Sequence, residues 1–324
     1  MVRYIGNKTN LLDFIHTEII NVCGNLSDVK FCDLFAGSGS VGRYFKQFCF
    51  EVTTNDLEMY SYVLCRNYVG NNTYLTEAYD VIAELNNLTP LEGRFYENFS
   101  PAGGRMFFTE YNAKKIDAIR QHIERYQNYP DLYFFLLASL IESADSISNT
   151  TGVYGAFLKS FNGKSQKNII LEPAIFKKGA NGICYNKNAN DLIKTISGDI
   201  LYLDPPYNNR VYGANYHILN YLVDYYAFEF NTESKTALGE YNRSDYSTKK
   251  NAAKAFEELI SNADYKYIFV SYNNEGIMTF EQMKDIMSKY GEYSLKSKDY
   301  KRYKSNSHSQ KTNSVLEYLH VLQK

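Results

Sequence analysis

Short apolar runs alternate with amphipathic stretches over the first part of the chain. Residues 29–35 and 51–55 are rich in β-branched and aromatic side chains, which is typical of buried strands. A helical pattern follows each of them, at 41–48 and at 57–68. Strand–helix alternation of this kind indicates parallel strands joined by crossover helices. The first segment therefore predicts the beginning of an open α/β sheet.

The pattern changes after residue 71. Helical periodicity dominates 76–88, 109–127 and 131–148, whereas 149–185 is rich in Gly, Asn and Lys and has no clear period. Alternation returns near residue 190, with strands expected at 200–203, 267–271, 292–296 and 315–322 and helices expected near 190 and at 216–228, 248–262 and 279–289. We therefore expect an α/β domain with a mostly parallel, twisted sheet, built from residues 1–74 and 181–324 and interrupted by a largely helical insertion at 75–180.

Composition supports a folded, water-soluble chain. The sequence has 324 residues, of which 44% are hydrophobic and 16% aromatic, enough for a packed core. It has no apolar run of about eighteen residues, and its first residues lack the apolar stretch of a signal peptide. The five cysteines are scattered without CxxC spacing, and the histidines lack metal-ligand spacing. These features predict a cytoplasmic protein with reduced thiols, no membrane partner and no metal site.

Charge is segregated along the chain although the net charge is only −1. Residues 158–187 and 296–311 each contain six basic residues against one acid, a net charge of +5 in each segment. The second segment interleaves its charges with aromatic rings in KDYKRYK, a pattern that favours nucleic acid. Solvated lysine-rich loops are the alternative interpretation of both segments.

A glycine-rich loop follows the first predicted strand. In DLFAGSGSVG (33–42), the glycines Gly37, Gly39 and Gly42 have GxGxxG spacing, and Asp56 lies at the end of the next strand. Such a loop lets the backbone approach a ligand closely, and the second acid can bind ribose hydroxyls. Asp33 suits a cationic ligand better than a pyrophosphate, because like charges repel. The set favours S-adenosylmethionine over a dinucleotide.

Two adjacent prolines follow the apolar run 200–203. Proline lacks a backbone donor and fixes φ, so Pro205 and Pro206 end the strand and hold Asp204 and Tyr207 at its tip. In open α/β sheets, ligands bind at the carboxyl ends of the strands. A plain strand followed by a turn is the alternative for this tetrapeptide alone.

Together, RYIGNK (3–8), DLFAGSGSVG, Asn55-Asp56, Gly198-Asp199 and DPPY (204–207) resemble, in content and order, the motifs of D12-class (Dam-like, alpha-group) N6-adenine-specific DNA methyltransferases. The resemblance implies a Rossmann-like S-adenosylmethionine-dependent methyltransferase fold, with 75–180 as a target-recognition insertion. It also implies methylation of an adenine flipped out of duplex DNA, for restriction protection or epigenetic marking. A separate cognate restriction endonuclease is compatible with this activity.

The resemblance implies a role for each matching residue. Tyr4 and Lys8 would touch the methionine end of the cofactor, and Asp56 would hold its ribose. Asp204 and the Pro205 carbonyl would accept hydrogens from the adenine amino group, with Asp204 also near the cofactor. Pro206 would stiffen this tip, and Tyr207 would stack on the base. The remaining cofactor-pocket residues would be Asp33, Phe35, Gly37, Ser38 and Gly39, with Asp199 near the cofactor adenine.

DNA contacts are expected from two places outside these motifs. The first is the segment 152–161, with Tyr154 and Lys159, together with the basic run after it. The second is the basic run that contains Lys301, Arg302 and Tyr303. His217 is expected to be packed or solvated rather than functional.

Three other classes of protein remain open at this point. The pattern Asp224…Glu233-Ser-Lys235 mimics the D…ExK metal site of restriction nucleases. An amino-methyltransferase acting on RNA or on cytosine N4 would use the same strand-tip tetrapeptide. A DNA-binding module with an inactive cofactor fold is the third.

Overall fold

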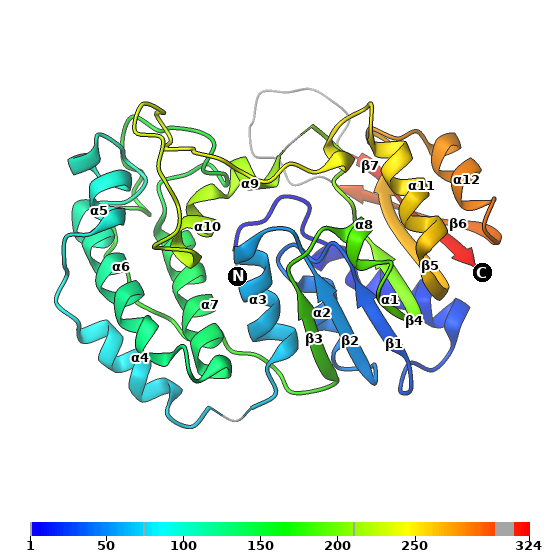
Figure 1. Ribbon diagram of the computed structural model, residues 1–324, viewed down its shortest axis with the longest axis horizontal. Coiled ribbons are helices and arrows are strands. Elements are labelled where there is room, and N and C mark those ends of the chain that lie inside the picture. The colour runs from blue at the N-terminus through cyan, green and yellow to red at the C-terminus, as the bar shows by residue number, and fades with distance from the viewer. Residues whose placement is uncertain (1, 74, 210, 302–313) are drawn as a thin grey trace.

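The computed structural model of the protein describes residues 2–73, 75–209, 211–301 and 314–324. Its centre is a seven-stranded sheet with the order β3-β2-β1-β4-β5-β7-β6 (Figure 1). The strands β1 to β5 run parallel, and β7 runs antiparallel to both β5 and β6. The strands are β1 (Lys30–Asp33), β2 (Glu51–Asn55), β3 (Asn181–Tyr185), β4 (Ser197–Leu203), β5 (Asp264–Asn273), β6 (Glu292–Lys301) and β7 (Ser314–Gln323). The mostly parallel α/β sheet predicted from the sequence is confirmed.

Helices flank the sheet and form a second group beside it. They are α1 (Leu12–Cys23), α2 (Ser40–Phe45), α3 (Met59–Cys65), α4 (Ala78–Asn87), α5 (Arg94–Phe99), α6 (Glu110–Ile123), α7 (Pro130–Ile147), α8 (Ala189–Leu192), α9 (Tyr212–Asn215), α10 (His217–Val223), α11 (Ala252–Asn262) and α12 (Phe280–Met287). Four elements, α1, α5, α9 and β3, were not expected from the sequence. Helix α10 ends at Val223, five residues before the predicted end, because Asp224 has non-helical dihedral angles.

Side chains of the central strands alternate between two cores, as a period of two requires. Ile200 and Tyr202 of β4 pack in the core beneath α1 and α2. Leu201 and Leu203 pack in the opposite core, with residues of α8, α11 and α12. Because both faces of β1 and β4 are covered, the middle residues of these strands are apolar. Charged side chains lie only toward their ends, Lys30 and Asp199 at the amino edge of the sheet and Asp33 at the carboxyl edge.

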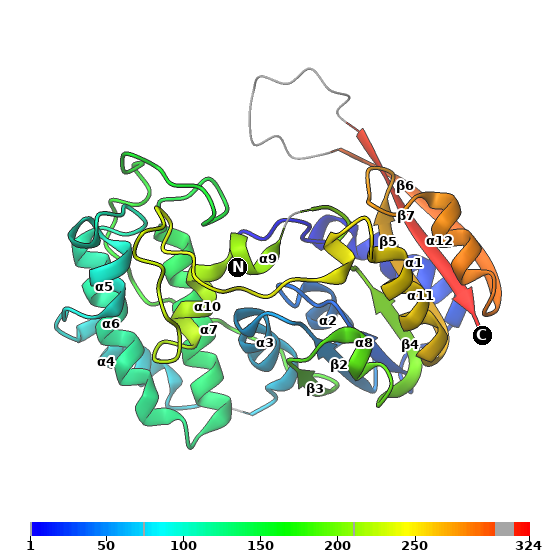
Figure 2. The same cartoon turned by 45° about the horizontal axis from the view of Figure 1, so that its top comes forward.

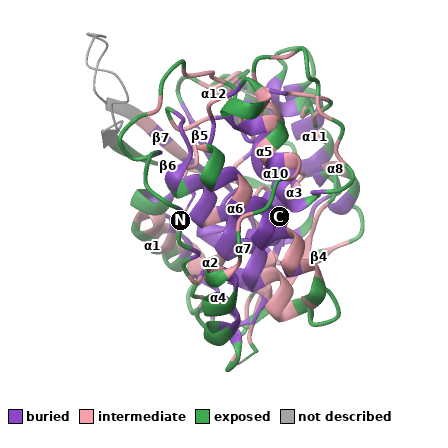
Figure 3. Cartoon of the chain, turned by 90° about the vertical axis from the view of Figure 1, so that its left-hand side faces the viewer, coloured by how far each residue is buried: buried purple, intermediate pink, exposed green. Residues whose placement is uncertain are grey.

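The third core belongs to the helical region, in which α4 to α7 and α10 lie together at the left of Figure 1. Much of α6 and α7 is buried inside it (Figure 3). Residues of α3 join this core from the sheet side, among them Tyr60, Val63 and Leu64. Residues of α10 and the following loop also pack there, although they lie outside the predicted insertion at 75–180. Within the described ranges, no helix has both the length and the apolarity needed to cross a bilayer.

Candidate cofactor cleft and strand-tip site

A cleft of about 440 Å³ lies at the carboxyl ends of the parallel strands. Segments that follow β1, β2, β3 and β4 all contribute to its wall, together with the N-terminal segment before α1. It brings together nine of the residues predicted from the sequence, namely Tyr4, Lys8, Asp33, Phe35, Gly37, Ser38, Asp56, Asp204 and Pro206. Residues of the first motif (3–8) and of the last motif (204–207) therefore line the same cleft.

The glycine loop needs glycine for two different reasons. Gly37 and Gly39 have φ values of 54° and 73°, which side chains disfavour. A Cβ on Gly37 would also lie 2.7 Å from a ring carbon of Tyr4. The Gly37 amide donates to Oδ2 of Asp56 at 2.7 Å, so the tip of β2 holds the loop in place. Gly39 caps the start of α2 and does not line the cleft.

Tyr4 forms a wall of the cleft beside this loop. Its ring stacks on Tyr212 and Tyr216, with centroid distances of 5.3 and 5.2 Å. The Tyr216 hydroxyl accepts from the Ile5 amide and donates to the Arg3 carbonyl. The helical region therefore fixes the chain on both sides of Tyr4.

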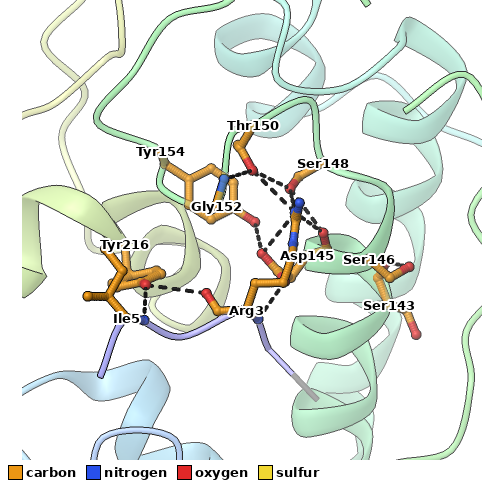
Figure 4. A network of polar contacts seen from close by, with 10 residues as sticks. All are labelled: Arg3, Ile5, Ser143, Asp145, Ser146, Ser148, Thr150, Gly152, Tyr154 and Tyr216. Atoms are coloured by element: carbon orange, nitrogen blue, oxygen red, sulfur yellow. Dashed lines mark hydrogen bonds and ion pairs between the residues drawn. The ribbon is translucent and has the colours of Figure 1, made fainter. Parts of the chain in front are cut away.

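Arg3 extends this connection to α7 (Figure 4). Its backbone amide and its Nε both donate to Oδ2 of Asp145, at 3.0 and 3.3 Å. Its guanidinium also donates to Ser148 and Thr150 in the loop after the helix. The network ties the segment that contains Tyr4 and Lys8 to the end of α7.

Asp33 is the most deeply buried acid of the cleft, with 1% of its surface exposed. Its Oδ2 accepts from the Gly42 amide at 3.1 Å, whereas Oδ1 has no hydrogen-bond partner among the described residues. Burial, reinforced by the charge of Asp204, raises the pKa of Asp33 to about 8. A buried carboxyl with an unpaired oxygen suits a cationic ligand, which would stabilise its ionised form.

Asp204 follows β4 directly and forms an ion pair with Lys8, with 3.1 Å between Oδ1 and Nζ. The same Nζ lies 3.0 Å from Oε1 of Glu317 on β7. Burial raises the pKa of Asp204 to about 6, although Lys8 acts in the opposite direction. Burial would lower the pKa of Lys8, but the two carboxylates outweigh it, and this pKa lies well above its usual value. Lys8, expected beside the methionine end of the cofactor, thus has two protein partners.

The rest of the DPPY tetrapeptide anchors the tip of β4. Pro205 is buried beneath the cleft, and Pro206 lines it. The Tyr207 carbonyl accepts from the Ile277 amide at 2.9 Å, and its ring packs edge-on against Tyr272. Tyr207 is half-buried beside the cleft and is not among its lining residues.

The far wall of the cleft was missed by the sequence analysis. It comes from the segment after β3, from the loop before α11 and from α11 itself, with Lys187, Asn188, Asp191, Asn242, Tyr246, Lys254 and Glu258. Tyr246 packs edge-on against Phe35, with 5.0 Å between the ring centroids. Because β3 was not predicted, the polar residues at its tip gave no signal. Recognising residues 181–185 as a strand would have placed them at this edge.

Two residues that were expected in the site lie elsewhere in the structure. Asp199 lies in the first half of β4, where its Oδ2 accepts from the Lys30 amide at 2.8 Å, and it does not line the cleft. Tyr154 is fully buried, and its hydroxyl donates to Asp145. A buried phenol cannot contact DNA, so Tyr154 supports the network around Arg3 instead.

The other expected DNA-contacting residues have different outcomes. Lys159 is exposed in a loop, as a contact to DNA requires. Lys301 ends β6, and Arg302 and Tyr303 lie outside the described residues. His217 is buried and packed as expected, with its ring nitrogens beside the carbonyls of Ala214 and Thr236. Among the residues that the structure places, no three His, Cys, Asp or Glu side chains cluster as metal ligands.

Comparison with known proteins extends these observations to the whole chain. Residues 4–286 match the family model described as D12 class N6 adenine-specific DNA methyltransferase. The type II methyltransferase M.NlaIII of Neisseria lactamica is 48% identical over 100% of this chain and 99% of its own length. The type II methyltransferase M.CviAII of Paramecium bursaria Chlorella virus 1 is 36% identical over 98% of this chain and 97% of its own length. The modification methylase StsI of Streptococcus sanguinis is 35% identical over 100% of this chain, which spans 52% of that protein.

These matches support DNA adenine methylation over the nuclease, the RNA or cytosine-N4 methyltransferase and the inactive binding module. The methyl donor of this family is S-adenosylmethionine, and the cleft suits it. Its glycine loop leaves room for a closely bound ligand, and its carboxylates Asp33 and Asp204 match the positive charges of the donor's methionine end. The chain therefore belongs to the D12 class of N6-adenine-specific DNA methyltransferases.

Proposed function

We propose that Asp204, Pro205 and Tyr207 hold a flipped target adenine at the tip of β4, facing the cofactor cleft. One observation carries this proposal. Asp204 lines the same 440 Å³ cleft as Asp33 and the glycine loop, so an amine held by Asp204 would lie beside a ligand held by that loop. The half-buried Tyr207 lies next to this position and offers a ring for the base.

The chemistry follows from the weak nucleophilicity of the adenine amino group. Its lone pair is delocalised into the purine ring, and Asp204 and the Pro205 carbonyl can each accept one of its hydrogens. These contacts draw the nitrogen toward a tetrahedral shape with its lone pair directed into the cleft. As the nitrogen becomes cationic, the same acceptors bind it more strongly than in the ground state, which lowers the barrier.

The other residues of the cleft would hold the cofactor, which would supply a methyl group on a positively charged sulfur. Asp33 would face its positively charged end, and Tyr4 would pack against it. Asp56, which holds the Gly37 amide, would bind its ribose. Lys8 holds the Asp204 carboxylate in place, and that carboxylate must accept a hydrogen bond from the target amine. Alignment of the reacting atoms by these rigid elements is itself a large part of the rate enhancement.

We further propose that DNA lies across the carboxyl edge of the sheet, with the insertion at 75–180 reading the target sequence. The lysines of 158–187 are all exposed, as phosphate contacts require. Figure 2 shows the loop after α7 on the same side of the molecule as the end of β6 near residue 301 and the start of β7 near residue 314. Flipping the base costs a few kcal/mol, and stacking on Tyr207, worth roughly 1–3 kcal/mol, offsets part of that cost.

The relatives named as type II methyltransferases suggest a biological setting. We propose that this enzyme protects host DNA within a restriction-modification system and that a separate endonuclease recognises the same sequence. Genomic DNA from cells that express the enzyme would then resist cleavage by that endonuclease, whereas DNA from cells that express an Asp204→Ala variant would be cut.

Transfer of labelled methyl groups tests the reaction directly. The protein is incubated with tritiated S-adenosylmethionine and either mixed-sequence duplex DNA or RNA, and the labelled nucleoside is identified. We expect label only in N6-methyladenine from DNA. Label in N4-methylcytosine, label in RNA or no label would contradict the proposed function.

A further inference from the structure

Glu317 is a buried acid in a largely apolar stretch of β7. Its neighbours on the same face of the strand, Leu319 and Val321, belong to the core beneath α1. Asp33 of β1 and Tyr202 of β4 lie opposite each other on neighbouring strands, and Tyr202 faces this same core. Because β7 is antiparallel, its first residues lie at the edge where β1 and β4 end. The strand therefore delivers Glu317 to the tip of β4 from the opposite direction.

Glu317 and Asp204 share one ammonium group. Lys8 Nζ lies 3.0 Å from Oε1 of Glu317 and 3.1 Å from Oδ1 of Asp204. The Ser271 hydroxyl donates to the same Oε1 at 2.8 Å, which fixes the orientation of the Glu317 carboxylate. Glu317 and Lys8 are only 6% and 5% exposed, so solvent screens this arrangement weakly.

We infer that Glu317 is a positioning residue for methyl transfer, which takes up part of the charge of Lys8 and so leaves the Asp204 carboxylate available to the target amine. This inference rests on the proposed role of Asp204 as acceptor. Glu317 acts through Lys8 and does not line the cleft.

The physical reason is competition between two carboxylates for one cation. If Glu317 were neutral, the Lys8 ammonium would have a single anionic partner and would bind Asp204 more tightly. A carboxylate held in a tight ion pair accepts other hydrogen bonds less well, because its negative charge is already compensated. Sharing the ammonium keeps Asp204 fixed and preserves its strength as an acceptor.

Four other titratable groups lie close enough to interact electrostatically with Asp204 or Lys8. They are Asp33 of β1, Tyr202 of β4, Tyr207 and Tyr212. Burial is the main cause of the raised pKa of Asp204, and the charge of Glu317 raises it further. Removing that charge should therefore lower the pKa of Asp204.

The test replaces the charge but keeps the shape, in the variant Glu317→Gln. Single-turnover rates are measured from pH 5 to 8 with saturating S-adenosylmethionine and duplex DNA. We expect the rate at pH 7 to fall about tenfold. We also expect the acidic limb of the pH profile to move to lower pH by about one unit, because the pKa of Asp204 falls when the charge of Glu317 is removed. The KM for the cofactor should stay within about twofold of its original value, and Glu317→Asp should restore part of the rate.

A second measurement follows the protonation of Asp204 directly, without cofactor or DNA. Carboxyl resonances of ¹³C-labelled aspartate are titrated in the protein without cofactor, and the Asp204 signal is assigned by its absence in Asp204→Asn. We expect this signal to titrate at lower pH in Glu317→Gln. The control is Glu292→Gln, which removes an exposed carboxylate of the neighbouring β6 and should leave both measurements unchanged.

Two outcomes would overturn the inference. The first is a Glu317→Gln enzyme with an unchanged rate and acidic limb. The second is a lower rate with a lower melting temperature but an unchanged Asp204 titration, which would assign Glu317 to stability alone. Failure of the proposed function would look different, because Asp204→Asn would then retain activity whatever the behaviour of Glu317→Gln.

Discussion

Arg3 binds Asp145 through both its backbone amide and its guanidinium, across 142 residues of sequence. The contact joins the segment that carries Tyr4 and Lys8 to the end of α7 (Figure 4). Asp145 is almost fully buried, and one-third of the Arg3 side chain is exposed. The cofactor cleft and the helical region are therefore mechanically connected.

Replacing the charge of Asp145 should weaken that connection. In Asp145→Asn, the loss of charge-assisted hydrogen bonds is expected to cost about 1.5–3 kcal/mol of folding stability. Cofactor affinity should also fall, because Tyr4 loses a fixed neighbour. Thermal unfolding and calorimetric titration with S-adenosylmethionine measure the two effects, with the exposed Asp80→Asn on α4 as control. A stability loss without any change in cofactor affinity would contradict the coupling.

Gly37 tests the close approach of the glycine loop to Tyr4. A Cβ at this position would meet the Tyr4 ring at 2.7 Å and would also disfavour the φ of 54°. We expect Gly37→Ala to weaken cofactor binding by about tenfold or more, which corresponds to the 1–3 kcal/mol typical of such strain. Gly163→Ala, which meets no atom within 4 Å, should bind the cofactor normally. Equal affinities of the two variants would show that the loop is not the binding element.

Asp33 should link cofactor binding to proton release. Its pKa of about 8 means that the carboxyl is mostly protonated at pH 7, and a cationic ligand should drive its ionisation. We therefore expect affinity for S-adenosylmethionine to rise with pH up to about 8 and then to level off. Calorimetry at pH 7 in phosphate and in Tris should give different heats, and Asp33→Asn should bind weakly and lose the difference. Identical heats in both buffers would refute this linkage.

The same carboxyl has the opposite effect on the stability of the protein without cofactor. Its pKa is raised above the unfolded value of 3.8, so the folded state binds the proton more tightly. The contribution of Asp33 to stability should therefore be largest at low pH and be lost as the pH rises through about 8. Asp33→Asn should reduce this pH dependence in denaturant unfolding.

The exposed lysines after α7 should act on DNA and not on the cofactor. We expect Lys159→Ala combined with Lys164→Ala to weaken duplex binding and to reduce the slope of log K against log salt by about 0.9 for each lost phosphate contact. The matched control changes two exposed lysines of another region to Ala, Lys284 on α12 and Lys289 just after that helix. Fluorescence anisotropy at several salt concentrations measures both slopes. Equal slopes for the two double variants would place the DNA elsewhere.

Strongly patterned segments allowed much of the fold to be predicted from the sequence. The buried strands 200–203 and 267–271 and the helices predicted at 76–88, 109–127 and 131–148 have clear periods, and the structure confirms them. Strand β3 was missed because its residues are polar or half-buried at the edge of the sheet and include Gly182, whose added Cβ would strike the Val69 carbonyl. Tertiary contacts of this kind are invisible to a local pattern.

The site was predictable where its residues follow strands in recognisable motifs. Asp33, Asp56 and Asp204 reach one cleft because parallel strands end at one edge. Asp199 was wrongly predicted as a cofactor contact because Gly198-Asp199 matched a motif. In the structure it lies near the amino end of β4, at the opposite edge of the sheet from the cleft. Glu317 was missed although a lone acid within the apolar run 315–322 is itself a signal of a buried polar role. Its partner Lys8 is too distant in sequence to be identified without the structure.

The central claim is that the Asp204 carboxylate accepts the target amine. It is tested most directly by single-turnover methylation with Asp204→Ala, with Asp199→Ala as control, a carboxylate of the same strand outside the cleft. We predict a loss of roughly 10²–10³-fold or more in rate for Asp204→Ala, as for removal of an electrostatic stabiliser. Cofactor and DNA binding should partly persist, and Asp199→Ala should remain active. Near-normal turnover by Asp204→Ala would contradict the account.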